Sequence, residues 1–149
     1  MNEGFRTFDH TGDLGLEVWA PDRERLFELA AEGVMAQVIE VGGARETRSG
    51  DAAGAAAERA TVELDGHDLA DLLVAWLNAA LLESELARAV WIRARIDSLS
   101  ATRLRGTLEG PRRDPVRQTF LREVKAVSHH ALELGARGAG WRCRVVLDI

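Results

Sequence analysis

Two carboxylates and an imidazole lie within five consecutive residues near the start of the chain, in the segment Asp9-His10-Thr11-Gly12-Asp13. Gly12 allows the backbone to bend sharply, so the side chains of Asp9 and Asp13 can converge on one cation. A turn held by hydrogen bonds from aspartate side chains to the backbone uses the same residue types. Taken alone, these residues leave both interpretations open.

The other end of the chain carries a second pair of oxygen donors. An alternating strand pattern runs to the last two residues, Asp148 and Ile149, and places a side-chain carboxylate beside a main-chain carboxylate. Such hard donors suit Ca²⁺ or Mg²⁺, whereas Zn²⁺ is usually held by histidine or cysteine. We therefore predict that the two ends of the chain meet at one hard-cation site.

A third segment whose side chains could take part in chemistry is 125–130, which reads Lys-Ala-Val-Ser-His-His. Alternate residues of a strand face opposite sides, which places Lys125 with His129 and turns His130 to the other face. The two histidines therefore cannot bind the same metal unless the strand is bulged. Lys125 is also the only lysine among 19 basic residues. This suggests a position that needs a compact ammonium group, although chance explains it equally well.

Composition excludes several classes of protein. Cys143 is the single cysteine, which rules out an internal disulfide framework and a cysteine-based zinc cluster. No apolar run resembles a signal peptide or a membrane helix, so we expect a soluble, cytoplasmic protein. A net charge of −5 argues against a dedicated nucleic-acid-binding domain. Phosphate-binding glycine loops and a serine nucleophile elbow are also absent from the sequence.

The first half of the chain must position the N-terminal segment. The pattern of residues 5–19 predicts a strand, and Asp22 is suited to cap a helix that ends near Gly42-Gly43. Residues 42–60 are rich in glycine and alanine and predict a loop without chemistry. A short strand over 61–64 follows.

The second half is richer in strands. Asp68 is suited to cap a second helix, with Trp76 as a core anchor. Alternation over 90–97 and 103–109 predicts a hairpin with one arginine-lined face, which also includes Trp91. The order of elements predicts a single α+β domain over residues 1–149, with a mixed β-sheet and two α-helices packed on one face.

Four segments resemble, in order, the signatures of the archease family: residues 9–19, 69–81, 123–130 and 141–149. Together they extend over nearly the whole chain. The resemblance implies an accessory protein of RNA processing that is not itself an enzyme. Its expected partner is the GTP-dependent tRNA-splicing RNA ligase, which joins ends bearing a 2′,3′-cyclic phosphate. The accessory protein would promote guanylate transfer to the ligase and multiple turnover.

The resemblance also implies a ligand set. The metal ligands would be Asp13, Asp148 and Ile149, the last through a main-chain oxygen. The expected cofactor is a divalent cation, foremost Ca²⁺, with Mg²⁺ or Mn²⁺ as alternatives. Residues that would support the site or contact the partner are Asp9, His10, Lys125 and His129.

Two alternatives belong to other functional classes. The first is a chaperone-like modulator of a tRNA cytosine methyltransferase that binds through the arginine-lined strand face. The second is an independent hydrolase that uses Asp9, His10 and His129, although no nucleophile and base can be paired in the sequence. In every case, contact with RNA is expected to be indirect.

Overall fold

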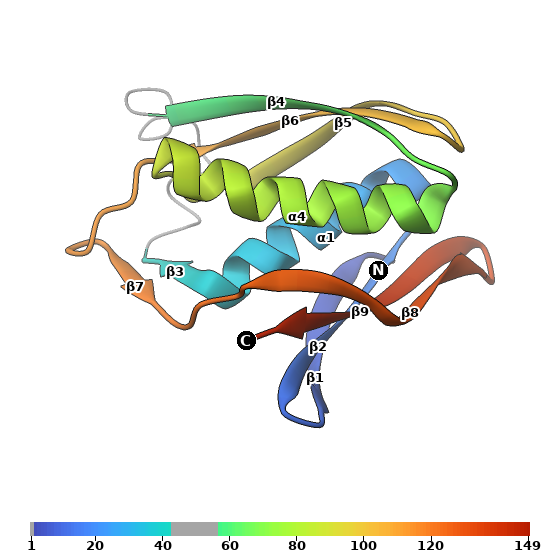
Figure 1. Ribbon diagram of the computed structural model, residues 1–149, viewed down its shortest axis with the longest axis horizontal. Coiled ribbons are helices and arrows are strands. Elements are labelled where there is room, and N and C mark those ends of the chain that lie inside the picture. Colours follow the sequence, from blue (N-terminus) through green and yellow to red (C-terminus); the bar gives the residue numbers. More distant parts are fainter. Residues whose placement is uncertain (1, 43–56) are drawn as a thin grey trace.

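Both ends of the chain lie in one four-stranded antiparallel sheet, here called the terminal sheet (Figure 1). The computed structural model describes residues 2–42 and 57–149. Strands of the terminal sheet lie side by side in the order β1 (Gly4–His10), β2 (Asp13–Ala20), β9 (Gly140–Asp148) and β8 (Ala126–Arg137). Its inner face contributes fully buried residues to the core: Leu16, Val18, Cys143, Val145 and Leu147.

The strand expected over residues 5–19 is in fact a hairpin. Strands β1 and β2 pair along their whole length, and only Thr11 and Gly12 separate them. Gly12 has a φ of +73°, in the left-handed region that tight hairpin turns require and glycine adopts without strain. The single-strand prediction was wrong because Thr11 and Gly12 reverse the chain, so residues 4–10 pair with residues 13–19 and do not continue them in one strand.

Both predicted helix starts are confirmed. Helix α1 (Arg23–Val38) begins after Asp22, whose carboxylate accepts a hydrogen bond of 2.8 Å from the Arg25 amide. Helix α4 (Leu69–Ala87) begins after Asp68, which accepts an equivalent bond from the Asp71 amide. Each cap satisfies a backbone N–H that has no partner within its own helix.

Helix α1 ends at Val38, before the predicted end near Gly42-Gly43. The next residues leave the helix because Ile39–Val41 forms strand β3, which pairs with β7 (Gln118–Phe120). A partner distant in sequence therefore decides this boundary. The predicted loop over 42–60 lies mostly outside the described residues, and its last residues belong to strand β4 (Ala57–Asp65).

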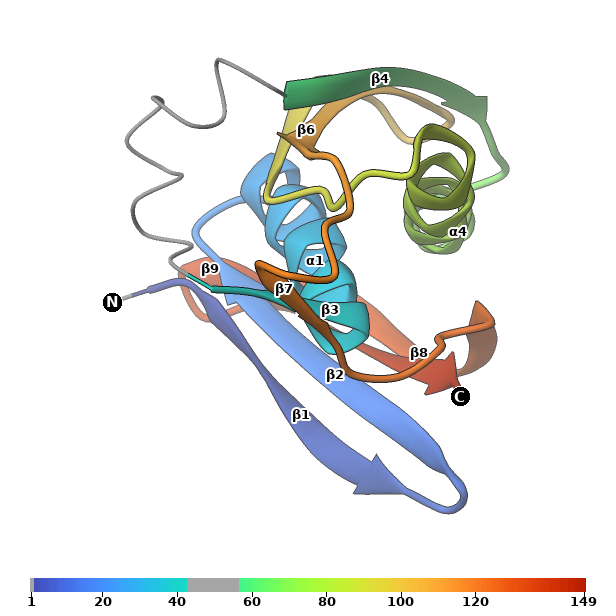
Figure 2. The same ribbon diagram turned by 90° about the vertical axis from the view of Figure 1, so that its left-hand side faces the viewer.

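A second sheet covers the helices from the opposite side. Strands β4, β6 (Arg103–Pro111) and β5 (Arg93–Leu99) pair in that order, and α1 and α4 lie between this sheet and the terminal sheet (Figure 2). The α+β class is confirmed, with both helices on one face of the terminal sheet. Within the described ranges, however, the strands form three antiparallel sheets rather than one mixed sheet. Helix α1 buries apolar side chains around most of its circumference and so needs cover on both sides.

The predicted arginine-bearing hairpin is confirmed as β5 and β6, with one correction. Trp91, expected beside the arginines, is 1% exposed and donates from its indole nitrogen to the Ala80 carbonyl oxygen at 3.1 Å. Strand β5 begins only at Arg93, so strict alternation does not govern residue 91. Several arginines of this sheet form ion pairs across strands, including Arg103 with Asp65.

Within the described residues, no helix is long and apolar enough to cross a membrane. Cys143 lies on the inner face of β9 and is fully buried. Burial raises the pKa of its thiol to about 12, so the reactive thiolate is scarce at neutral pH. Cysteine-based nucleophilic chemistry is therefore disfavoured at this position.

Glu17 is a buried carboxylate on the outer face of β2. It is 7% exposed and accepts hydrogen bonds from Arg6 of β1, at 2.8 Å, and from Arg142 of β9. Burial raises the pKa of this carboxyl, but the two guanidinium groups outweigh that effect and hold the pKa below its ordinary value of 4.5. Glu17 therefore links three strands of the terminal sheet.

Replacing Glu17 by glutamine is expected to lower the free energy of unfolding at neutral pH by about 1–3 kcal/mol, because two arginines lose a charged acceptor. Since the folded-state pKa is lowered, this contribution is complete above pH 4.5 and is lost as the pH falls through the folded-state pKa. Urea unfolding at neutral and at acidic pH measures the difference. A variant as stable as the wild type at neutral pH would contradict this assignment.

Candidate metal centre

Asp13 and Asp148 lie on neighbouring strands at the same end of the terminal sheet. Leu14 faces Leu147 at the last pair of the β2–β9 ladder. Asp13 precedes Leu14 and Asp148 follows Leu147, so the same register places the two aspartates across from each other. Facing residues of antiparallel strands project from one face, with Cβ atoms about 5 Å apart. Their carboxylates therefore share the outer face, opposite the core.

Both aspartates can be reached from solvent. The Asp13 side chain is 33% exposed, Asp148 is exposed, and Ile149 is 43% exposed. Two carboxylates held at this spacing repel each other unless a positive charge lies between them. A cation bound between the two aspartates would therefore be stabilised, and solvent can reach this position.

His10 belongs to the same group of side chains. It faces Asp13 in the β1–β2 ladder, and its Nδ1 lies 4.0 Å from the Asp13 Oδ2. This Nδ1 atom is buried and has no hydrogen-bond partner among the described residues. An unpaired buried polar atom costs about 1–3 kcal/mol, so a ligand or cation that engages it would be favoured.

The two adjacent histidines of β8 turn to different neighbours. The β8–β9 register shifts between Ser128 and Glu133, and Ala131 in this bulge has a φ of +58°. The ring of His130 meets that of His10 edge-on, with centroids 5.9 Å apart. His130 is thus a site neighbour that sequence reasoning did not select. The only sequence signal for His130 was its position next to His129, because two adjacent histidines can approach the same site only where a strand is bulged.

His129, predicted as a supporting residue, instead contacts α4. Its Nε2 lies 3.6 Å from the Asp71 Oδ1, and the other Asp71 carboxylate oxygen accepts from the His67 amide at 2.9 Å. The hydrogen bond from His67 and the nearby His129 ring lower the pKa of Asp71. The observed contact of His129 is therefore with the start of a helix rather than with Asp13 or Asp148.

Of the remaining predicted residues, Lys125 lies beside Asp148, whereas Asp9 lies on the other face of the sheet. The Lys125 amide donates to the Asp148 carbonyl oxygen at 2.8 Å, which brings Lys125 beside the aspartate through its backbone. Asp9 faces Leu14 in the β1–β2 ladder, so its side chain leaves the sheet on the face opposite to Asp13. The two carboxylates of the N-terminal segment do not converge, because each faces away from the other across the pleat.

The chemistry of the donors fits a hard divalent cation. Asp13 and Asp148 offer carboxylate oxygens, which Ca²⁺, Mg²⁺ and Mn²⁺ favour. Across residues 2–42 and 57–149, no three or more His, Cys, Asp and Glu side chains gather closely enough to hold a metal ion. Any such ion would need a further oxygen, and the main-chain oxygen of Ile149 follows directly after Asp148.

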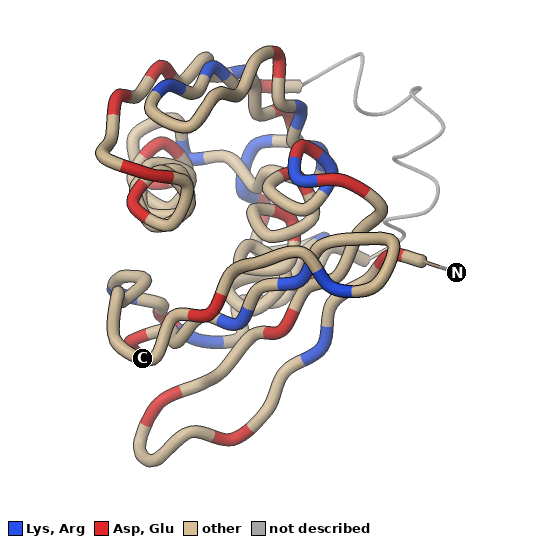
Figure 3. The backbone as a smooth tube through the Cα atoms, turned by 90° about the vertical axis from the view of Figure 1, so that its right-hand side faces the viewer, with Lys and Arg blue, Asp and Glu red and all other residues tan. Residues whose placement is uncertain are grey.

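The charge distribution separates the two ends of the terminal sheet. Acidic positions flank the β1–β2 turn and lie near the C-terminus, whereas the basic positions of β1 and of the β8–β9 hairpin lie towards the other end (Figure 3). Lys125, whose amide donates to the Asp148 carbonyl oxygen, adds one positive charge to this end. The aspartates outnumber it, so the end that carries Asp13 and Asp148 still favours cations.

Comparison with known proteins identifies relatives of the same length. Protein archease of Methanosarcina barkeri is 29% identical over 149 residues, covering 97% of this chain and 95% of the relative. Protein archease of Methanopyrus kandleri is 26% identical over 144 residues, covering 95% and 96%. The solution structure of protein 1598 from Methanobacterium thermoautotrophicum matches with a TM-score of 0.66 at 24% identity, over 98% of this chain and 99% of that one. This likeness shows a shared fold.

The match to a protein family extends over almost the entire chain. Residues 5–149 match the archease protein family, and they include all four segments on which the resemblance was based. The chain therefore belongs to the archease protein family.

Proposed function

We propose that this archease is a metal-binding accessory protein that activates a GTP-dependent tRNA-splicing RNA ligase, promoting guanylate transfer and repeated turnover. Membership of the archease family supports this proposal, since the ligase is the partner that the family resemblance implies. The chemistry of joining is assigned to the ligase. Archease would act on the state of that enzyme and not on RNA.

The observation that carries the proposal is the β2–β9 register, whose last pair is Leu14 and Leu147, so that the adjoining residues Asp13 and Asp148 end the two strands side by side. These aspartates come from opposite ends of the sequence, yet the strand register brings their carboxylates to one exposed sheet end. With the main-chain oxygen of Ile149, they would hold a divalent cation. Such a cation, when bound, would supply positive charge to the phosphates of a nucleotide or to carboxylates at the partner surface.

Other residues of this end would orient the ligands. The Lys125 amide fixes the backbone of Asp148 by a hydrogen bond of 2.8 Å. His10 lies beside Asp13, with its Nδ1 4.0 Å from the Asp13 Oδ2. The Lys125 side chain is exposed and would contact an anionic group of the partner. A rigid β-sheet is well suited to present these groups in one geometry.

The direct test is RNA joining by the cognate ligase with and without this protein. With RNA in excess, the joined product per ligase is expected to rise roughly tenfold, equivalent to about 1.4 kcal/mol of the limiting barrier. A guanylate-transfer assay without RNA should show faster formation of the guanylated ligase. The absence of any change in either assay would exclude the proposal.

Two controls separate this activity from simpler effects. Added Ca²⁺, Mg²⁺ or Mn²⁺ without the protein tests whether the ligase merely needs free metal. Asp65→Asn alters an exposed aspartate of the second sheet, 79% exposed, and should activate the ligase like the wild type. Activation by free metal alone, at the same level, would contradict a role for the protein.

A further inference from the structure

A cleft lies on the terminal sheet at the end opposite Asp13 and Asp148. It encloses about 710 Å³, and its walls include four arginines and two tryptophans: Arg6, Arg137, Arg142, Arg144, Trp19 and Trp141. We call it the arginine cleft. Its volume falls within the range of about 300–1,000 Å³ that small-molecule sites occupy. Trp19 lies six residue steps along β2 from Asp13, a span of about 20 Å.

The strand register explains why these side chains gather. Glu17 of β2 faces Arg6 of β1 on one side and Arg144 of β9 on the other. Two residues further along β2, Trp19 faces Arg142. Because residues two apart in a strand share a face, both rows project from the outer side of the sheet.

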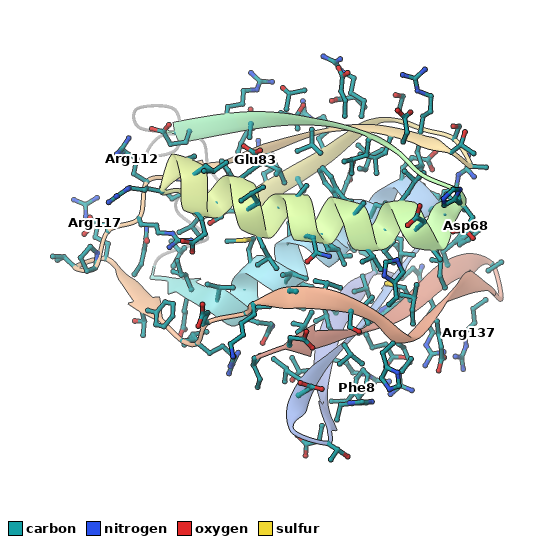
Figure 4. All side chains as sticks on the ribbon, in the orientation of Figure 1. Phe8, Asp68, Glu83, Arg112, Arg117 and Arg137 are labelled. Atoms are coloured by element: carbon teal, nitrogen blue, oxygen red, sulfur yellow. The ribbon has the colours of Figure 1, made fainter. Side chains whose placement is uncertain are left out.

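Some guanidinium groups of the cleft are held in place by Glu17, whereas others can still bind a ligand. Glu17 binds Arg6 and Arg142, which fixes both guanidinium groups in place. The Arg6 side chain nevertheless remains 70% exposed. Arg137 is exposed at the end of the β8–β9 hairpin (Figure 4). It forms no hydrogen bond or ion pair with any described residue. The cleft therefore presents guanidinium groups that are not saturated by carboxylates.

The charge of the cleft opposes that of the whole protein. Its lining holds four arginines and the carboxylate of Glu17, and Glu133 beside it pairs with Arg142 at 3.7 Å and with Arg144 at 4.0 Å. The group keeps a formal charge of +2, whereas the chain carries −5. Guanidinium groups bind phosphate in a bidentate geometry and favour it over most other anions. The local excess of positive charge thus points to a phosphate-bearing ligand.

The tryptophans indicate which kind of phosphate-bearing ligand fits the arginine cleft. Trp76 and Trp91 are buried and use their indole nitrogens within the core, whereas Trp19 and Trp141 are only partly buried and line the cleft. The Arg6 guanidinium lies over the Trp19 ring, 5.6 Å from its centroid. Indole rings beside guanidinium groups form the usual platform for nucleic-acid bases and their phosphates.

We propose that the arginine cleft binds a nucleotide unit, with its base stacked on Trp19 and its phosphate held by Arg137 and Arg6. Two sources share this chemistry, a free nucleotide and one residue of a single-stranded RNA. The inference does not depend on activation of a ligase. It assigns the protein a direct contact with nucleotides, which its net negative charge would not predict.

The test measures binding of a short, fluorescein-labelled oligouridylate by fluorescence anisotropy. Arg137→Ala is expected to weaken binding about fivefold at low salt and to make the slope of log affinity against log salt shallower by about 0.7. Trp19→Leu should weaken binding roughly 5- to 100-fold without changing that slope, and Trp19→Phe should restore most of the loss. Thermal unfolding of each variant shows whether it is folded.

Matched controls decide the outcome. Arg95→Ala removes the same charge from an exposed position of β5 in the second sheet and should leave binding within about twofold of the wild type. Competition by uridine monophosphate as strong as by the oligonucleotide would identify a free nucleotide as the ligand, and weak competition would identify the RNA strand. The proposal is overturned by equal losses in the Arg137 and Arg95 variants, or by tripolyphosphate competing as well as a nucleotide does. Absence of binding by RNA and nucleotide at about 1 mM also overturns it.

Discussion

Changing Asp148 to asparagine is expected to weaken divalent-cation binding roughly 10- to 100-fold, because the site loses one of two charged oxygen ligands. The substitution preserves the size of the side chain. It also removes the repulsion between Asp148 and Asp13, so the metal-free variant should unfold at the same temperature as the wild type or higher. Calorimetric titration with Ca²⁺, Mg²⁺ and Mn²⁺ measures the affinity. Ligase activation should fall in proportion to the loss of bound metal.

Asp9→Asn is the matched control for this prediction. It removes the same charge from the same end of the sheet, but the Asp9 side chain lies on the opposite face from Asp13. Cation affinity should therefore stay within about threefold of the wild type, since only screened long-range attraction is lost. If Asp9→Asn and Asp148→Asn weaken binding equally, the cation is attracted by general acidity and the assigned ligands are wrong.

Replacing Trp76 by alanine is expected to lower the free energy of unfolding by about 3–5 kcal/mol, a large part of the stability of an ordinary domain. Trp76 is fully buried in α4, between the two sheets, and its indole nitrogen donates to the Phe27 carbonyl oxygen at 2.9 Å. Gly106 of β6 leaves room for the ring, because a Cβ at that position would lie 2.7 Å from it. The substitution therefore opens a cavity and removes the indole hydrogen bond to the Phe27 carbonyl oxygen.

Urea unfolding followed by circular dichroism measures this loss. Leu82→Ala provides the comparison, because Leu82 lies on the same helix but is 57% exposed, and its truncation should cost no more than about 0.5 kcal/mol. A Trp76→Ala variant that loses less than about 1.5 kcal/mol would show that the layer between the sheets repacks more easily than expected. It would not support Trp76 as the anchor between the helices.

The two sites lie at opposite ends of one sheet. Asp13 and Asp148 mark the acidic end, whereas the arginine cleft lies about 20 Å along β2. If both assignments hold, archease would present a cation and a nucleotide contact on a single rigid surface. The Asp148 and Arg137 variants can then be combined, and their effects on the two binding reactions should be additive because the residues share no partner.

Features set by neighbouring residues could be predicted from the sequence. Asp22 and Asp68 were identified as helix caps because a cap depends on atoms only a few residues away. The inward alternation of β9 and the burial of Trp76 follow from local hydrophobic period in the same way. Asp13, Asp148 and Ile149 were selected by residue type and by resemblance to a family, and their role as ligands stays a prediction.

Features that depend on pairing between distant strands were decided only by the tertiary structure. Register alone places Asp13 beside Asp148, turns Asp9 to the other face and gathers the arginine cleft. The bulge in β8 directs His130 to His10 and leaves His129 with Asp71, although the two histidines are adjacent in sequence. Residue types specify which groups are available, but hydrogen bonds between remote strands determine which of them meet, because a one-residue shift would reverse every face.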